Sequence, residues 1–326
     1  MDKEKTPVID VIIPAYKPDS SFKKLLKLLQ EQTVRPHHIY ILQTVEDGEL
    51  PMEPDGNMIS VHPVRRQEFD HGATRDYGAR LADGDSPETL GQHYILFMTQ
   101  DAVPAGNDLL EQLLKPFDRE RTAITYARQL ARKEAGILEE LTRIHNYPPE
   151  DQIKGKEDLE HLGIKTYFCS DVCAMYRLDR YREMGGFVHP TIFNEDMIMA
   201  SKVIQAGYQV VYCSKAQVIH SHSYTCMQQF HRNFDLGVSQ RQYREVFENI
   251  SSEKEGAGYA KNTLLYLLKK AKPAKAFYFA LQCGFKLAGY KLGKNYDKLP
   301  AWMVHACTMS PGYVLFQKDR SKQSDR

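Results

Sequence analysis

The sequence predicts an α/β protein with a mostly parallel central sheet, followed by a helical, basic, amphipathic C-terminal region. Two observations lead to this class: strand-like and helix-like segments alternate over the first half of the chain, and after Tyr224 the pattern changes to helices. Strands that alternate with helices build parallel sheets covered on both faces. We therefore expect two parts, residues 1–225 and residues 226–326.

The chain opens as strand, helix and strand. VIDVIIPAY (Val8 to Tyr16) is an apolar strand run, SSFKKLLKLLQEQT carries Phe22, Leu25 and Leu29 at helical spacing, and HHIYILQT is a second strand run. The turn after the first strand, PAYKPDSS, contains no glycine, whereas the dinucleotide-binding fingerprint needs three there. A Rossmann dehydrogenase is therefore disfavoured, and the sequence also lacks a P-loop, a G-x-S-x-G elbow and an H-E-x-x-H motif.

Further helices are expected at GATRDYGARLA and NDLLEQLLKPF, on either side of the strand HYILFM. From Arg119 to Lys165 the chain is polar and is broken by Pro148-Pro149, which favours helices and a loop rather than more central sheet. Strand-like sequence patterns occur again in TYFCSDVCAMYR and YQVVYCSKAQVIHSHSY.

Composition narrows the class of protein. The formal net charge of +1 argues against a nucleic-acid binder. The mixed-charge start with its short apolar run is not a signal peptide, so we expect a cytosolic protein. Six cysteines without a C-x-x-C pair argue against a zinc knuckle and predict reduced, mostly buried thiols.

Polar residues follow three of the predicted parallel strands: Pro14-Ala15-Tyr16, Gln43-Thr44 and Thr99-Gln100-Asp101. Ligands bind beyond the carboxyl ends of such strands, so these groups are expected on one rim. Asp101 could hold Mg²⁺ or Mn²⁺ through oxygen, with diphosphate oxygens completing the coordination. It could equally cap the next turn.

Two further groups could carry chemistry. Glu195-Asp196 opens a predicted helix after the flexible EMGGF segment, although acids at a helix start are favoured by the dipole alone. His220 and His222 are two residues apart, hence on the same side of a strand end. Either imidazole could join Asp101 at a metal ion, or both could be ordinary polar residues.

The C-terminal region has a distinct charge pattern. Between Tyr259 and Tyr296 there are eight lysines and no Asp, Glu or Arg, interleaved with leucines and aromatic residues. The longest apolar stretch, AFYFALQCGF, is too short to span a bilayer. We expect this region to lie on an anionic membrane surface; the alternative is a helical appendage whose lysines only face water.

The ordered set of motifs resembles a known family. VIIPAY, HGATRDYGARLA, YILFMTQDAVP, FCSDVCAMYR, GGFVHPTIFNEDMIMASKVIQAGYQVVY and VIHSHSY, spread over residues 8–245, are similar to family 2 glycosyltransferases of GT-A fold, and most similar to the bacterial rhamnosyltransferase branch. The resemblance implies a GT-A nucleotide-sugar-binding domain and transfer of a sugar from a nucleotide diphosphate with inversion.

The resemblance also implies roles for matching residues. Pro14, Ala15 and Tyr16 would lie near the nucleotide. The family's D-x-D motif matches Thr99-Gln100-Asp101, which keeps only the last carboxylate, so Asp101 is the implied metal ligand with Gln100 beside it. The later histidine of the family matches His220 or His222.

The family's acidic pair matches Glu195-Asp196, with Asp196 as the general base. Its R-N-x-G segment appears as Arg75-Asp76-Tyr77-Gly78, so Arg75 and Asp76 are donor-site candidates, although Arg75 could also pack structurally. Where the family's second strand commonly ends in acids that contact the base, this sequence offers Gln43 and Thr44.

Two more residues are candidates for the acceptor side. Asp171 could position the acceptor, or be satisfied by backbone amides; Arg232 could reach a diphosphate of the donor or of a lipid-linked acceptor, or form a surface salt bridge.

We therefore expect an inverting glycosyltransferase that moves L-rhamnose from dTDP-rhamnose onto a saccharide or polyprenyl-diphosphate-linked acceptor in cell-wall or surface polysaccharide synthesis. It would work at the inner face of the cell membrane. Alternative donors are UDP-galactofuranose, UDP-glucose and UDP-GlcNAc. A non-catalytic membrane-associated subunit is a second class, and a nucleotidyltransferase a third, although its glycine-rich, lysine-bearing phosphate loop is missing.

Overall fold

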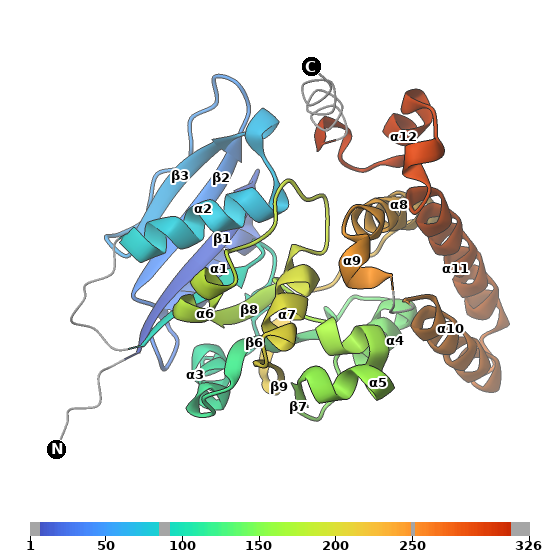
Figure 1. Ribbon diagram of the computed structural model, residues 1–326, viewed down its shortest axis with the longest axis horizontal. Coiled ribbons are helices and arrows are strands. Elements are labelled where there is room, and N and C mark those ends of the chain that lie inside the picture. Colours follow the sequence, from blue (N-terminus) through green and yellow to red (C-terminus); the bar gives the residue numbers. More distant parts are fainter. Residues whose placement is uncertain (1–6, 85–91, 249–251, 314–326) are drawn as a thin grey trace. The chain divides into compact units, whose positions relative to one another are not determined.

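The computed structural model describes residues 7–84, 92–248 and 252–313 (Figure 1). The chain forms two compact units. The first comprises Met1–Ala135, Thr142–His189 and Glu195–Ser221; the second comprises Gly136–Leu141, Pro190–Asn194 and His222–Arg326. The second unit thus takes two short pieces from the middle of the chain before its main piece begins near the predicted boundary.

The described part of the first unit is built on a nine-stranded sheet in the order β3-β2-β1-β4-β8-β6-β9-β5, with β7 paired to β9. The strands are β1 (Val8–Tyr16), β2 (His38–Val45), β3 (Ile59–Arg65), β4 (His93–Met98), β5 (Val103–Pro104), β6 (Thr122–Leu130), β7 (Gln152–Lys154), β8 (Cys173–Arg177) and β9 (Gln209–Ile219). β1 to β4, β6 and β9 run in one direction, whereas β5, β7 and β8 run in the other. The predicted α/β class with a mostly parallel sheet is confirmed.

Helices cover both faces of the sheet near β1. Val11 and Ile13 pack in one hydrophobic cluster with α1 and α3, whereas Ile12, which points the other way, lies against Gly78 of α2. The helix α1 begins where expected because the Asp19 carboxylate caps it, accepting from the N–H of Ser21 at 2.8 Å. The α-helices of this part of the chain are α1 (Ser20–Gln30), α2 (His71–Gly84), α3 (Leu109–Leu114), α4 (Ile137–Asn146), α5 (Leu159–Leu162), α6 (Leu178–Glu183) and α7 (Glu195–Gln205).

One prediction about the middle of the chain is wrong. The segment from Arg119 to Lys165 was expected to add no central strand, but β6 lies inside the sheet between β8 and β9. Its sequence, TAITYARQL, looks polar because it contains two threonines, an arginine and a glutamine. Two of these polar side chains have partners in the interior: Thr125 Oγ1 donates to the Leu113 carbonyl at 2.9 Å, and Gln129 Nε2 donates to Ser170 Oγ at 3.0 Å. A satisfied polar residue can occupy a buried strand without changing its backbone.

The second unit is helical, as the sequence predicts. Its helices in the described residues are α8 (Cys226–Gln242), α9 (Arg244–Phe247), α10 (Ser252–Lys269), α11 (Pro273–Gly293) and α12 (Ala301–Cys307). The backbones of α8 and α11 are in close contact at two glycines of α11. A Cβ added at Gly289 would clash with the carbonyl oxygen of Phe230, and one added at Gly293 would clash with that of Phe234. Among the helices that the structure describes, none is long and apolar enough to cross a membrane. All six cysteines are free thiols, buried or half-buried, as predicted.

Candidate active site

The end of β1 is tied to the turn that follows β4. The backbone N–H of Tyr16 donates to Gln100 Oε1 at 2.7 Å, and Gln100 Nε2 donates back to the Tyr16 carbonyl at 3.0 Å. Pro14 and Ala15 precede this point inside β1. The reciprocal pair places the residue before Asp101 against the end of the first strand, so two of the three predicted rim groups meet.

The third rim group differs from the expectation. β2 continues to Val45, so Gln43 and Thr44 are buried within the strand, and Gln43 Oε1 accepts from the N–H of Met52 at 2.9 Å. The first residue beyond the strand is Glu46. The strand ends beyond the two residues predicted for the rim, because a buried Gln and Thr resemble strand-end residues. The residue that follows the strand is an acid.

Glu46 belongs to an exposed polar group on the rim. Its carboxylate accepts from the Tyr16 hydroxyl at 2.7 Å and pairs with Arg66, whose guanidinium lies 5.4 Å from the centre of the Tyr16 ring. The hydrogen bonds from Tyr16 and Arg66 lower the pKa of Glu46, which is ionised at neutral pH. Of these three residues, only Tyr16 was predicted from the sequence to belong to the site.

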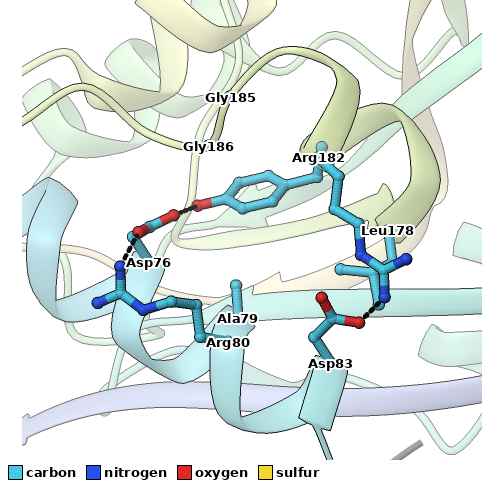
Figure 2. Close-up of a pocket in the computed structure, with 9 residues that line it drawn as sticks. Asp76, Ala79, Arg80, Asp83, Leu178, Arg182, Gly185 and Gly186 are labelled. Atoms are coloured by element: carbon cyan, nitrogen blue, oxygen red, sulfur yellow. Dashed lines mark hydrogen bonds and ion pairs between the residues drawn. The ribbon is translucent and has the colours of Figure 1, made fainter.

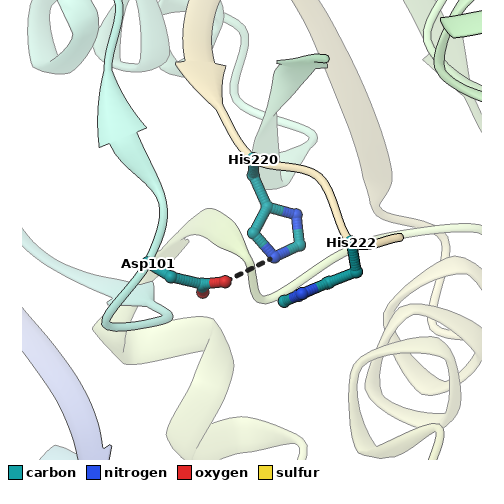
Figure 3. Close-up of side chains that lie close together, drawn as sticks. All are labelled: Asp101, His220 and His222. Carbon is teal, nitrogen blue, oxygen red and sulfur yellow. Dashed lines mark ion pairs between the residues drawn. The ribbon is translucent and has the colours of Figure 1, made fainter. Parts of the chain in front are cut away.

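Asp101, His220 and His222 lie close together beyond the strand ends (Figure 3). Each offers one ligand atom, and these atoms all lie within 4.8 Å of one another. His220 Nε2 is 3.5 Å from Asp101 Oδ2. One carboxylate and two imidazoles form a donor set that suits Mn²⁺ better than Mg²⁺, because Mg²⁺ prefers oxygen ligands alone.

The strand β6 orients His220. Its Nδ1 is 2.9 Å from Gln129 Oε1, and because that oxygen can only accept, Nδ1 carries the proton. Gln129 Nε2 donates in turn to Ser170 Oγ at 3.0 Å. With Nδ1 turned to Gln129, Nε2 of His220 faces Asp101, and in the neutral form it would offer its lone pair to a cation bound between them. Gln129 was missed because the strand that carries it was missed.

A buried group of charges contains the second predicted motif. Arg75 Nη1 is 3.1 Å from Glu195 Oε1, and Arg75 Nε is 3.8 Å from Asp171 Oδ2. Asp171 also accepts from the Tyr176 hydroxyl at 2.6 Å. Asp196 lies alongside: its Oδ1 accepts from the N–H of Met197 at 2.7 Å. Arg75, Asp171 and Glu195 are buried, whereas Asp196 is half-buried.

The charges in this group do not balance, since three carboxyl groups share one guanidinium. Burial and the neighbouring Glu195 raise the pKa of Asp196 to about 7. Burial and Asp196 raise the pKa of Asp171 well above its ordinary value, although Arg75 opposes both shifts. The group therefore holds a proton near neutral pH, and Asp196 is the member that retains contact with solvent.

The short segment Ser170-Asp171-Val172 joins the two clusters. Ser170 receives the hydrogen bond from Gln129, and the N–H of Asp171 donates to Asp196 Oδ2 at 3.3 Å. The carbonyl of Val172 accepts from the N–H of Thr99 at 3.2 Å, at the start of the turn that carries Asp101. This one segment is thus hydrogen-bonded both to the surroundings of the candidate metal ligands and to the candidate base.

Asp76 does not join the buried group of charges but lines a pocket of about 210 Å³, which is formed by α2, α6 and the loop after α6 (Figure 2). Its carboxylate accepts from the Tyr181 hydroxyl at 3.0 Å and from Arg80 at 2.9 Å. Asp76 follows Arg75 and so lies about 100° around the helix from it. Arg75 therefore lies in the acidic group, whereas Asp76 lies in the pocket between α2 and α6.

Arg232 lies in the second unit, on α8. Its exposed guanidinium stacks over the rings of Phe193 and Tyr224, 4.6 Å and 5.6 Å from their centres. These ring contacts favour one orientation of the guanidinium.

The α/β fold, with carboxylates and imidazoles gathered beyond the strand ends, defines a GT-A type glycosyltransferase. The chain belongs to glycosyl transferase family 2, whose model matches residues 10–185. It is 36% identical over 311 residues to the O-antigen chain rhamnosyltransferase RfbN of Salmonella typhimurium, covering 94% of this chain and 95% of that protein. It is 34% identical over 316 residues to the O-antigen chain rhamnosyltransferase WbaN of Salmonella anatum, covering 94% and 96%. The family and branch recognised from the motifs are confirmed.

Solved structures agree on the fold. The mannosyltransferase PcManGT from Pyrobaculum calidifontis, in complex with GDP-Man and Mn²⁺, aligns with a TM-score of 0.58 at 11% identity, over 91% of this chain and 89% of that one. TarS residues 1–349 of S. aureus align with a TM-score of 0.51 at 15% identity, over 98% and 88%. The predicted GT-A architecture is confirmed, and the chain is a glycosyltransferase.

Proposed function

We propose that this glycosyltransferase moves L-rhamnose from dTDP-rhamnose, with inversion, onto a saccharide borne on a polyprenyl diphosphate during surface polysaccharide synthesis. The observation that carries the donor assignment is the similarity, along 94% of the chain, to two O-antigen chain rhamnosyltransferases. The geometry of the rim supports the chemistry. The enzyme would act in the cytoplasm at the inner face of the membrane, where such acceptors are anchored.

Asp101, His220 and His222 would hold Mn²⁺ or Mg²⁺. The donor set fits, because Gln129 binds Nδ1 of His220 and leaves Nε2 facing the Asp101 carboxylate. The bound ion would supply positive charge for the diphosphate leaving group. Arg232, held over two aromatic rings, would bind a diphosphate of the donor or of the acceptor.

Tyr16, Glu46 and Arg66 would form the wall against the nucleoside, together with Pro14 and Ala15 of the same strand. The aromatic ring offers a stacking surface, and the carboxylate accepts hydrogen bonds from a ribose or base. Gln100 would keep this wall in register with Asp101, because it is hydrogen-bonded to both backbone atoms of Tyr16.

Asp196 would be the general base. Its pKa of about 7 suits a group that must be ionised to take a proton and then release it. It would accept the proton of the acceptor hydroxyl as the oxygen attacks the anomeric carbon from the side opposite the diphosphate. Glu195, Arg75 and Asp171 would set its orientation and proton affinity, with Asp171 also able to reach the acceptor.

The donor is tested with a panel of dTDP-rhamnose, UDP-galactofuranose, UDP-glucose and UDP-GlcNAc. We expect dTDP-rhamnose alone to raise the melting temperature with Mn²⁺ and to be hydrolysed slowly without acceptor. Preference for a UDP-sugar would refute the donor assignment while leaving the enzyme class intact.

The catalytic assignment is tested with Asp196→Asn, and Asp118→Asn on the surface is the matched control. We expect transfer by Asp196→Asn to fall by at least about 10²-fold while donor binding remains. Asp101→Asn should instead lose Mn²⁺ affinity, measured by calorimetry. Unchanged transfer by Asp196→Asn would refute its role as base, and absence of transfer by the wild type with every donor would favour a non-catalytic subunit.

A further inference from the structure

One face of α11 is apolar and exposed along most of its length. Phe277, Leu281 and Leu287 are 75%, 44% and 54% exposed. Phe277 and Leu281 are four residues apart and lie on one side of the helix, together with three small residues: Ala280, Gly284 and Ala288. Leu287 lies at the edge of this side, about 80° around the helix from Phe277. From residue 277 to residue 288 this face, which we call the α11 face, extends for about 17 Å.

The α11 face is not needed to hold the second unit together. The opposite side of α11 makes the packing contacts: Gly289 and Gly293 meet α8, while Phe279 lies edge-on to Tyr259 of α10 at 5.7 Å. Residues at 277, 281 and 287 point away from those contacts. A soluble helix ordinarily turns charged residues to water on such a side.

Lysines are exposed near both ends of the face. Lys272 and Lys275 are exposed at its N-terminal end, and Lys291 is exposed at its C-terminal end. Lys286 is the sole charged residue between positions 276 and 290, and it lies on the opposite side, where burial lowers its pKa. An apolar stripe with lysines near both ends can lie on an anionic bilayer surface, because the apolar side chains can enter the acyl-chain region while the long lysine side chains extend to the phosphates.

The adjacent helix repeats the pattern. On α10, Leu265 and Leu268 are exposed, with the exposed Lys261 and Lys269 at neighbouring positions on the same side of that helix. No acidic residue occurs from Tyr259 to Tyr296. A second copy of the chain is a poorer occupant, because antiparallel pairing of two α11 faces would bring the lysines of one copy against those of the other.

We propose that the α11 face docks on the anionic lipid surface of a membrane, with Phe277, Leu281 and Leu287 inserted among the acyl chains and the flanking lysines at the headgroups. The biological use of this docking rests on the proposed function, because docking would keep the enzyme close to an acceptor carried by the membrane. Lipid binding itself is independent of the sugar that is transferred.

The test is sedimentation of the full chain with vesicles of phosphatidylcholine alone or mixed with phosphatidylglycerol, at low and high salt. The apolar variant is Phe277→Ser/Leu281→Ser/Leu287→Ser, and its control replaces three exposed apolar residues of the first unit: Leu50→Ser/Ile144→Ser/Ile153→Ser. We expect the wild type and the control to bind the anionic vesicles at low salt, and the apolar variant to bind at least about tenfold more weakly.

The charge contribution is tested separately with Lys272→Gln/Lys275→Gln/Lys291→Gln. Since each lysine near such a surface contributes about fivefold, three replacements should weaken binding by about a hundredfold. The control Lys23→Gln/Lys24→Gln/Lys215→Gln removes the same charge from exposed positions of the first unit and should bind nearly as the wild type does.

Several results would overturn the proposal: no binding to anionic vesicles at low salt, equal loss in the face variants and their controls, or a dimer in analytical ultracentrifugation that the apolar variant abolishes. Donor hydrolysis in solution separates this proposal from the previous one. A face variant that hydrolyses donor normally but no longer binds vesicles supports docking, whichever sugar the donor carries.

Discussion

Replacing Asp196 should remove activity and should be less harmful to stability at alkaline pH than at acidic pH. The carboxyl group is more easily protonated in the folded state, where its pKa is about 7, than in the unfolded state, where the ordinary value is 3.8. Between these two pKa values the folded state holds a proton that the unfolded state releases. The contribution of Asp196 to stability is therefore greatest below the lower pKa and is lost as the pH rises through the higher one.

The magnitude follows from the two pKa values. The full linkage is about 4 kcal/mol, and roughly 2.5 kcal/mol of it is lost between about pH 5 and about pH 8. Because Asp196 is half-buried and water relaxes around it, we expect about 2 kcal/mol. In Asp196→Asn the amide oxygen can still accept from Met197, but the amide nitrogen faces the N–H of Asp171, which costs about 1–2 kcal/mol at every pH.

The constant cost cancels when the two pH values are compared. The assay is urea unfolding of the wild type and Asp196→Asn at about pH 5 and about pH 8, and Asp118→Asn on the surface is the control. We expect the free energy of unfolding of Asp196→Asn, relative to the wild type, to rise by about 2 kcal/mol from the lower to the higher pH. A pH-independent difference, or one of opposite sign, would refute the raised pKa and with it the reasoning on the base.

Three further outcomes are expected. Arg75→Leu should lower the free energy of unfolding by about 3–5 kcal/mol, because it leaves the buried carboxylates without their cation, and Arg75→Lys should lose less; equal losses in urea unfolding would contradict the ion-pair argument. Gln129→Leu should weaken Mn²⁺ binding by about 10–100-fold in calorimetry through loss of the hydrogen bond to His220, and unchanged affinity would exclude this orienting role. Gly293→Val should cost about 3 kcal/mol or more by forcing α8 and α11 apart, whereas Gly284→Val, which meets open space, should change thermal stability little; similar effects would argue against the close packing.

Much of the site could be predicted from the sequence because its residues stand at strand and helix ends. Tyr16 and Asp101 follow apolar runs that read as strands, and Glu195-Asp196 begins a helix with regular apolar spacing. Parallel strands end on one rim, so local patterns were enough to predict that Tyr16 meets the turn that carries Asp101. The charge pattern of the C-terminal region was also readable, since lysines and aromatic residues are counted without knowing the fold.

Other features required long-range contacts. The polar residues of β6 made the strand hard to recognise in the sequence, because the partners of Thr125 and Gln129 belong to other segments. Gln129 was missed together with the strand. Glu46 and Arg66 are separated by twenty residues yet share one hydroxyl, that of Tyr16.

The sequence by itself determined the α/β class, the family and the carboxylates and imidazoles at the strand and helix ends, because each depends on a local pattern. The tertiary structure decided which of these groups act on one another. Arg75 joined Asp171 and Glu195, and Asp76, one residue later, turned to another pocket. The same holds for α11, where packing with α8 and α10 settles which apolar residues are buried and leaves Phe277, Leu281 and Leu287 exposed. Burial and proximity shift pKa values and create binding faces, and both arise only when segments distant in sequence pack together.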